Sequence, residues 1–181
     1  MSSSIEIKEM SPTEIEFALE VEKAAFASES EAQLCKDLFQ DSSAEPYLSL
    51  LAFDQKLAVG HILFTKATLA TLPQKNFRLL APLAVIPSHQ KQGIGLQLVR
   101  KGLDILRQQR VEWVFVLGHI TYYPKAGFFP AYQISVDPPY PIAEEVRDAW
   151  MVHTLGNDIQ QHHSARLACC RAFDKPEHWR E

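Results

Sequence analysis

Two glycines near the middle of the chain have the spacing and the setting of a phosphate-binding loop. An apolar run, Leu83-Ala84-Val85-Ile86, is followed by the polar segment 87–92 and then by Gly93-Ile94-Gly95. Because glycine has no Cβ, the backbone N–H groups around these two residues can approach an anion closely. If a helix begins here, its first N–H groups and the positive end of its dipole add to the attraction. The segment therefore predicts a pyrophosphate site that needs no arginine.

The residues that follow have the period of a helix. Apolar or small residues recur at three- and four-residue steps and so share one helical face: Gly95, Leu98, Val99, Gly102, Leu103 and Leu106. Two common phosphate-binding patterns are absent from the sequence. No GxGxxG follows an early strand, as in a dinucleotide-binding fold, and no Gly-Lys is followed by Ser or Thr, as in a P-loop.

The rest of the chain predicts short strands and helices in mixed order. In sequence these are a strand over 5–8, helices over 11–26 and 31–40, strands over 47–53, 56–65 and 77–86, the helix from Gly93, and strands over 113–117 and 149–155. The segment 130–141 is expected to be irregular. This pattern indicates an α+β protein, a mixed sheet with flanking helices.

The composition narrows the class of protein. Of the 181 residues, 46% are hydrophobic, which suffices for one sizeable core. We therefore expect a single domain over 1–181, with 136–181 as a variable C-terminal part. A net charge of -4 does not favour nucleic acid as a partner. No basic region leads into an apolar stretch, and no run approaches the roughly 18 apolar residues that cross a bilayer. We expect a cytoplasmic protein without a membrane partner.

Three cysteines and two neighbouring histidines raise the question of a metal. Cys35, Cys169 and Cys170 form neither a disulfide framework nor a CxxC pair, which suits a reducing compartment. Adjacent residues on a strand point to opposite faces, so neither Cys169-Cys170 nor His162-His163 makes a ligand pair, and zinc-finger spacing is absent. We therefore expect no metal.

Two motifs resemble signatures of a known family. Gln90-x-x-Gly93-x-Gly95 resembles the (Arg/Gln)-x-x-Gly-x-(Gly/Ala) signature of the GNAT acetyltransferases, and an apolar strand precedes it as in that family. Tyr123-x-x-x-Gly127-Phe128 is similar to a second signature and follows in the expected order. Further segments resemble the YhbS-like branch, and the resemblance covers residues 5 to 135: Gly60-His61-Ile62, Leu80 to Val85, and Val116-Leu117-Gly118-His119 followed by Tyr122 to Phe128.

The resemblance implies a GNAT fold that binds acetyl-CoA. In that fold the fourth and fifth strands are parallel neighbours that splay apart, and the pantetheine arm of the coenzyme lies in the gap. Backbone groups of Leu83 and Val85 would pair with the arm, and an N–H near Ala84 or Val85 would stabilise the oxyanion formed from the thioester. The pyrophosphate would be surrounded by Gln90, Lys91, Gln92, Gly93, Ile94, Gly95 and Leu96. Many relatives carry arginine at the position of Gln90, which contributes no charge.

The resemblance also assigns a general acid. Tyr123 matches the family tyrosine that protonates the departing thiolate, and a phenol with a pKa of about 10 is protonated at neutral pH. Tyr122, its neighbour, is expected to line the wall. An acceptor amine must lose a proton to attack, so a base or a water chain is needed. His61, His119 and Glu22 are the candidates, and alternation along the third strand can turn His61 toward the cleft.

The expected activity is direct, sequential transfer of an acetyl group to an amine of an unidentified small molecule or peptide. Cys35 has no visible histidine partner, so a covalent intermediate has little support. Two alternatives stay open: a non-catalytic module that binds CoA or acyl-CoA, and an acyltransferase for a longer acyl-CoA. The tail 172–181 has three open roles: docking on the body, closing the acceptor cleft, or pairing with a second subunit in a homodimer.

Overall fold

The protein is built around a mixed sheet. The computed structural model describes residues 4–156 and 164–180. Seven strands form the main sheet in the order β1-β2-β3-β4-β5-β8-β6. They are β1 (Ile5–Glu9), β2 (Leu48–Asp54), β3 (Leu57–Ala67), β4 (Phe77–Val85), β5 (Trp113–Leu117), β6 (Phe129–Pro130) and β8 (Trp150–Thr154). Within this sheet β4 and β5 are parallel, and the other neighbours pair antiparallel. Two short strands, β7 (Val136–Asp137) and β9 (Ala165–Arg166), form a second sheet.

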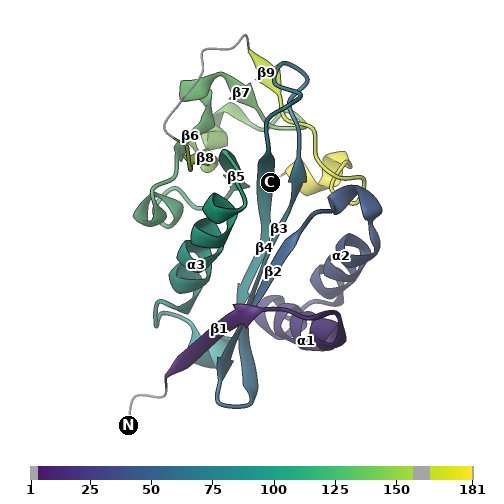
Figure 1. The fold of residues 1–181 in the computed structure, drawn as a ribbon, viewed down its shortest axis with the longest axis vertical. Helices are drawn as coiled ribbons and strands as arrows, with labels where there is room; N and C mark the ends of the chain where they lie inside the picture. The colour runs from purple at the N-terminus through teal and green to yellow at the C-terminus, as the bar shows by residue number, and fades with distance from the viewer. Residues whose placement is uncertain (1–3, 157–163, 181) are drawn as a thin grey trace.

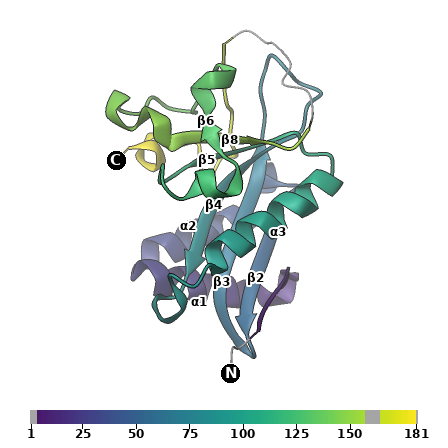
Figure 2. The same ribbon diagram turned by 90° about the vertical axis from the view of Figure 1, so that its left-hand side faces the viewer.

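Helices cover both faces of the main sheet (Figures 1 and 2). Helices α1 (Ile15–Phe26) and α2 (Glu29–Gln40) lie on one face, and α3 (Ile94–Gln108) lies on the other. All six members of the stripe predicted on α3 are buried. The helix comes very close to the sheet at Gly102, where a Cβ would lie 2.4 Å from the ring of Phe64. The α+β architecture expected from the sequence is thus confirmed.

The beginning and end of several elements differ from expectation. The capping box before α1 is present, since the Glu14 side chain accepts a hydrogen bond from the Ser11 N–H at 2.9 Å, but the first turn is 3₁₀. Helix α2 begins earlier than predicted because the Ser28 side chain caps it, accepting from Ser30 N. The segment 130–141, expected to be irregular, contains β7. Across the described residues, no helix is long and apolar enough to cross a bilayer.

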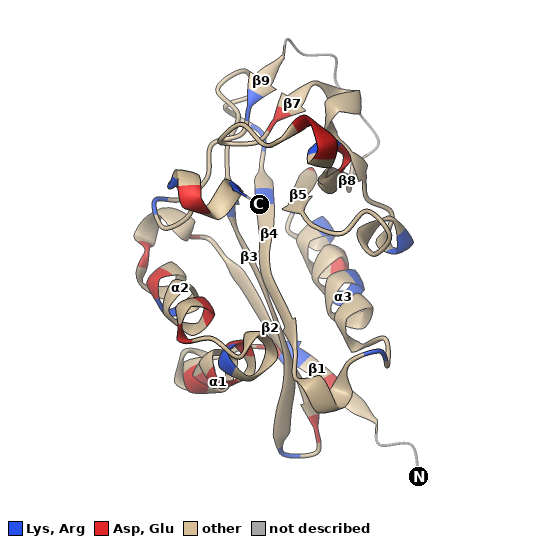
Figure 3. Ribbon diagram, turned by 180° about the vertical axis from the view of Figure 1, so that it is seen from behind, with Lys and Arg blue, Asp and Glu red and all other residues tan. Residues whose placement is uncertain are grey.

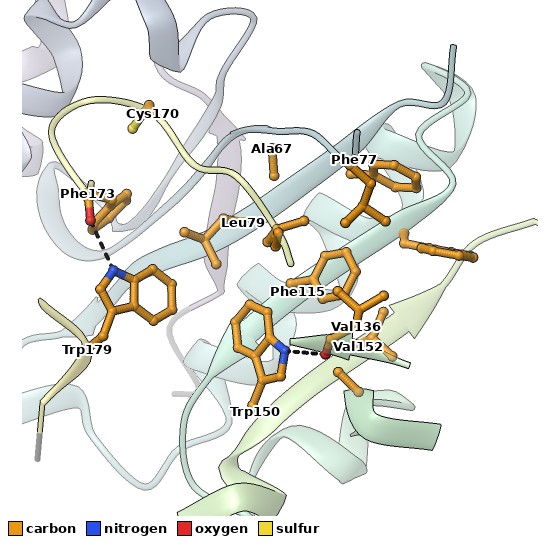
Figure 4. Packing of buried hydrophobic residues seen from close by; sticks show 14 of the residues in the cluster. Ala67, Phe77, Leu79, Phe115, Val136, Trp150, Val152, Cys170, Phe173 and Trp179 are labelled. Atoms are coloured by element: carbon orange, nitrogen blue, oxygen red, sulfur yellow. Dashed lines mark hydrogen bonds between the residues drawn. The ribbon is translucent and has the colours of Figure 1, made fainter. Parts of the chain in front are cut away.

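The C-terminal segment docks on the body. Phe173 and Trp179 join the core formed by β4, β5 and β8, as Figure 4 shows, and Trp179 is only 4% exposed. The ring of Trp179 packs edge-on against Trp150, with 5.7 Å between centroids. Both indole N–H groups are satisfied by backbone carbonyls, Trp150 by Val136 and Trp179 by Phe173, each at 3.0 Å. The tail therefore docks on the body, as the first of the three expected roles requires.

Asp41, directly after α2, fastens this segment to the body. Its carboxylate accepts hydrogen bonds from Ala172 N at 2.9 Å and from Ser43 N and Oγ at 2.9 and 2.6 Å. The guanidinium of Arg171 lies 3.3 Å away. Burial by itself would raise the pKa of Asp41, but the hydrogen bonds from Ser43 and Ala172 and the charge of Arg171 lower it to about 2.

Asp41→Asn is expected to reduce the free energy of unfolding at pH 7 by about 1–3 kcal/mol, because charge-assisted hydrogen bonds across the docking contact are lost. The folded-state pKa of about 2 lies below the unfolded value of about 3.9. The carboxylate therefore stabilises the fold above pH 4, and this contribution is lost as the pH falls toward 2. Urea unfolding at pH 7 and pH 3 should show a smaller difference between variant and wild type at pH 3. Asp104→Asn, which removes an exposed ion pair with Arg107, is the control. An equal loss of unfolding free energy in this variant would contradict the stabilising role of Asp41.

Candidate active site

Strands β4 and β5 separate partway along β4. They pair in parallel only from Phe77↔Trp113 to Leu79↔Phe115. Beyond Leu79, β4 continues along β3, whereas β5 continues along β8. Figure 3 shows β5 beside only the upper part of β4, with α3 next to the lower part. Within the described residues, segment 80–85 therefore has no paired strand on its β5 side.

The free edge of β4 is formed by Leu83 and Val85. Ile86 donates its N–H to Val59 O on β3 at 2.9 Å, and Ala84 lies opposite His61 on the same strand. Since backbone groups alternate along a strand, Ala84 turns its N–H and C=O toward β3, whereas Leu83 and Val85 turn theirs into the gap. Of the two N–H groups expected to hold the thioester carbonyl, only that of Val85 faces the gap. The side chain of Ala84 packs against α1.

The loop between β4 and α3 is held by its own side chains. Gln90 Nε2 donates to Val85 O at 2.9 Å, and Gln92 Nε2 donates to Ser88 O at 3.3 Å. Gly93, with φ +82°, is the N-cap of α3, so the N–H groups at the start of this helix lie at the end of the loop. Ile94 buries its side chain and can offer only backbone, while Lys91 is exposed. The two glutamines therefore shape the loop, and the donors at its end are the main-chain N–H groups at the start of α3.

A histidine that the sequence analysis missed anchors this loop. His89 Nε2 lies 3.0 Å from Asp54 Oδ2, at the end of β2, and His89 Nδ1 lies 2.8 Å from Ser88 Oγ. The partners are 35 residues apart in sequence, so no local pattern indicates the contact. The bond to Asp54 ties the polar segment after β4 to the hairpin of β2 and β3.

The two tyrosines of the second signature have different surroundings. The hydroxyl of Tyr122 lies over the start of α3, where a Cβ at Gly95 would come within 2.1 Å of it. Tyr123 is 9% exposed, and its ring packs against Gly118 and edge-on to Phe128. Burial, with a smaller effect of Tyr122, raises the pKa of Tyr123 above its ordinary value. The phenol is therefore protonated at neutral pH, which is the state an acid needs.

Of the three candidate bases, His61 and Glu22 meet in the core and His119 lies at the surface. His119 is exposed in the turn before Tyr123, and its carbonyl accepts hydrogen bonds from the N–H groups of Tyr122 and Tyr123. His61 does not face the gap as the alternation suggested, because its side of β3 is covered by the helices. It is fully buried, with Nδ1 2.6 Å from Glu22 Oε1. His61 and Glu22 therefore bind each other beneath α1.

Ser49, His61 and Glu22 form the hydrogen-bond sequence of a catalytic triad, but they cannot act as one here. Ser49 Oγ lies 2.9 Å from His61 Nε2. The serine hydroxyl also lies 3.5 Å from Met10 Sδ and can donate to it, and in that arrangement it accepts from His61 Nε2–H and does not yield its proton to that nitrogen. All three residues are also buried, with Ser49 the most exposed at 4%. A nucleophile in this position has no access to substrate.

Comparison with known proteins agrees with the signatures. A family model described as "Acetyltransferase (GNAT) family" matches residues 15–128. The uncharacterized N-acetyltransferase YjhQ of Escherichia coli (strain K12) is 49% identical over 138 residues, which cover 75% of this chain and 76% of YjhQ. The uncharacterized N-acetyltransferase YhbS of the same strain is 31% identical over 137 residues, or 75% of this chain and 78% of YhbS.

Solved structures resemble the whole of the fold. The crystal structure of Escherichia coli YhbS in complex with CoA has a TM-score of 0.85 at 25% identity, covering 97% of this chain and 94% of that one. A GNAT acetyltransferase from Brucella melitensis in complex with acetyl-CoA has a TM-score of 0.74 at 25% identity, covering 95% and 99%. Because the family model spans more than half of the sequence and YjhQ is nearly half identical to it, the chain belongs to the GNAT acetyltransferase family.

Proposed function

We propose that the protein is an N-acetyltransferase that uses acetyl-CoA as cosubstrate and acetylates an amine of a small molecule or peptide. The observation that carries the proposal is the free edge of β4, which is joined by the loop 86–92 to the glycine-containing start of α3. Two proteins of similar structure, YhbS and the Brucella melitensis acetyltransferase, were solved with CoA and acetyl-CoA respectively. Cytoplasmic location is part of the proposal.

In the proposed site, backbone groups bind both the pyrophosphate and the pantetheine arm of the coenzyme. The pyrophosphate lies at the main-chain N–H groups of segment 90–96, where the helix dipole also favours negative charge. The pantetheine arm lies along the gap and pairs with the backbone of Leu83 and Val85. The Val85 N–H then points at the thioester carbonyl and stabilises the negative charge that develops on its oxygen.

Transfer proceeds without a covalent enzyme intermediate. The neutral amine attacks the thioester carbon, and the tetrahedral intermediate collapses as the carbon–sulfur bond breaks. Tyr123 donates its proton to the departing thiolate. The proton lost by the amine passes to His119 or to water, because His61 and Glu22 are buried against each other. Cys35 is buried, and burial, reinforced by the nearby Glu22, raises the pKa of its thiol, so a nucleophilic cysteine has no support here.

Thermal unfolding with coenzyme ligands tests the proposal. A ligand at about 100 times its dissociation constant adds roughly 2.7 kcal/mol to native stability, which raises Tm by several degrees. We expect this rise with acetyl-CoA and with CoA but not with NADH. Absence of a rise at millimolar acetyl-CoA would refute coenzyme binding. If Tm rises but no CoA thiol is released with any amine of a panel, the non-catalytic CoA-binding module is favoured. If thiol is released only from longer acyl-CoA thioesters, an acyltransferase for a longer acyl-CoA is favoured.

A further inference from the structure

Three side chains that commonly bind metals meet in the core beneath the helices. Glu22 comes from α1, Cys35 from α2 and His61 from β3, and one donor atom of each lies within 4.8 Å of the other two. All three residues are 0% exposed. No local pattern indicates this grouping, because its members lie far apart in the chain and follow none of the short ligand spacings. We refer to it as the Glu22–Cys35–His61 cluster.

The hydrogen bonds around His61 leave one nitrogen directed at the cluster. When Ser49 gives its own proton to Met10 Sδ, 3.5 Å away, it accepts from His61 Nε2. In this tautomer Nε2 carries a proton, and Nδ1 lies 2.6 Å from Glu22 Oε1. Histidines that bind metals are held in the same way, with the distal N–H donating to an oxygen and the proximal nitrogen directed at the ion.

Glu22 contributes a second, independent observation. One of its oxygens shares a proton with His61, but Oε2 is buried and has no hydrogen-bond partner among the described residues. A buried carboxylate oxygen left in this state is unfavourable, and buried polar atoms of this kind call for a missing ligand. A cation between the three side chains would supply that ligand.

We propose that the Glu22–Cys35–His61 cluster binds a Zn²⁺ ion through the carboxylate of Glu22, Sγ of Cys35 and Nδ1 of His61. The two oxygens of one carboxylate lie too close together to fill two tetrahedral positions, so Glu22 takes one position and Cys35 and His61 take two more. The mixed sulfur, nitrogen and oxygen set suits zinc better than magnesium or calcium, which prefer oxygen alone. Binding releases two protons, the one shared by Glu22 and His61 and that of the Cys35 thiol. The carboxylate, the thiolate and the divalent ion then sum to zero charge in a dry core.

The geometry requires a small rearrangement. His61 Nδ1 and Glu22 Oε1 are 2.6 Å apart in the proton-sharing state. Two ligand atoms on one tetrahedral zinc are roughly 3.3 Å apart, so this contact opens by about 0.7 Å as the ion replaces the proton. Because the cluster is closed to solvent, the ion enters as the chain folds, and it joins α1, α2 and β3. The proposal does not depend on acetyl transfer.

The test is the zinc content of the full-length protein, prepared without chelators from zinc-supplemented medium and, separately, refolded with Zn²⁺ or Co²⁺. We expect about one zinc per folded chain by mass spectrometry, and a thiolate-to-cobalt charge-transfer band after refolding with Co²⁺. Cys35→Ser should lose the band and most of the zinc. Cys169→Ser, which removes a cysteine outside the cluster, should keep both, and circular dichroism confirms that each variant is folded.

Two results would overturn the proposal. Wild-type protein that binds no zinc in either preparation and gives no cobalt band would show that the cluster is only a hydrogen-bonded chain. Zinc retained in folded Cys35→Ser would place the ion elsewhere in the molecule.

Discussion

Tyr123→Phe is expected to lower kcat by about 10²–10³-fold while leaving the affinity for acetyl-CoA within about twofold, because a positioned general acid contributes about that much to a rate. The variant keeps the ring that packs against Gly118 and Phe128 and removes only the hydroxyl. The thiolate would then leave unprotonated or take its proton from water. The measurement is thiol release under saturating acetyl-CoA and acceptor, with coenzyme affinity determined separately by calorimetry.

Tyr122→Phe is the matched control for this prediction. The two tyrosines are neighbours with ring centroids 5.1 Å apart, and each variant loses one phenolic oxygen. Since the hydroxyl of Tyr122 lies over Gly95, its loss should act on coenzyme affinity more than on kcat. If Tyr123→Phe retains wild-type kcat where chemistry limits the rate, Tyr123 is not the acid. A large fall in kcat for Tyr122→Phe alone would transfer the role to its neighbour.

Gly95→Glu is expected to weaken acetyl-CoA binding by at least about 10²-fold, which corresponds to losing about 2.7 kcal/mol. The new Cβ would lie 2.1 Å from the Tyr122 hydroxyl, so the tyrosine must move. The added carboxylate would also occupy the helix terminus that attracts the pyrophosphate and would repel it. Calorimetric titration with CoA measures the effect.

Gly156→Glu is the control, because no atom lies within 4 Å of a Cβ at that position. It introduces the same charge without crowding the loop and should bind CoA as wild type does. Gly93→Ala distinguishes the effect of backbone conformation on CoA affinity from the effect of steric crowding. Gly93 has room for a Cβ but has φ +82°, so alanine there strains the backbone at a cost of about 1 kcal/mol and should reduce affinity less than Gly95→Glu. A folded Gly95→Glu protein with wild-type affinity would contradict the pyrophosphate site.

Local sequence patterns predicted those parts of the fold that depend on neighbouring residues. The stripe on α3 follows from helical period alone, and the hairpin of β2 and β3 from two apolar runs around Asp54-Gln55. The splayed strands and the loop between β4 and α3 were expected from the family signatures, which carry three-dimensional information that a single pattern does not. The placement of β8 between β5 and β6 followed from neither, since strand order is set by packing between distant segments.

Side-chain orientation was the least predictable feature of the site. Alternation on β3 predicts that His61 and its neighbours face opposite sides of the sheet, but it does not predict which side is covered by α1. His61 therefore became a candidate for the cleft although it lies against Glu22, 39 residues away. The anchors made by His89 and Asp41 were missed for the same reason, because their partners are remote in sequence.

The docking of residues 170–179 has a consequence for synthesis on the ribosome. Chains emerge from the N-terminus and begin to fold as they appear. The apolar surface around Phe115 and Trp150 is complete only when Phe173 and Trp179 reach it, so it stays open to water and to other chains until residue 179 has left the ribosome. We expect nascent chains stalled before residue 170 to bind chaperones that recognise exposed aromatic segments. Chains that are released after synthesis of residue 180 should not bind these chaperones.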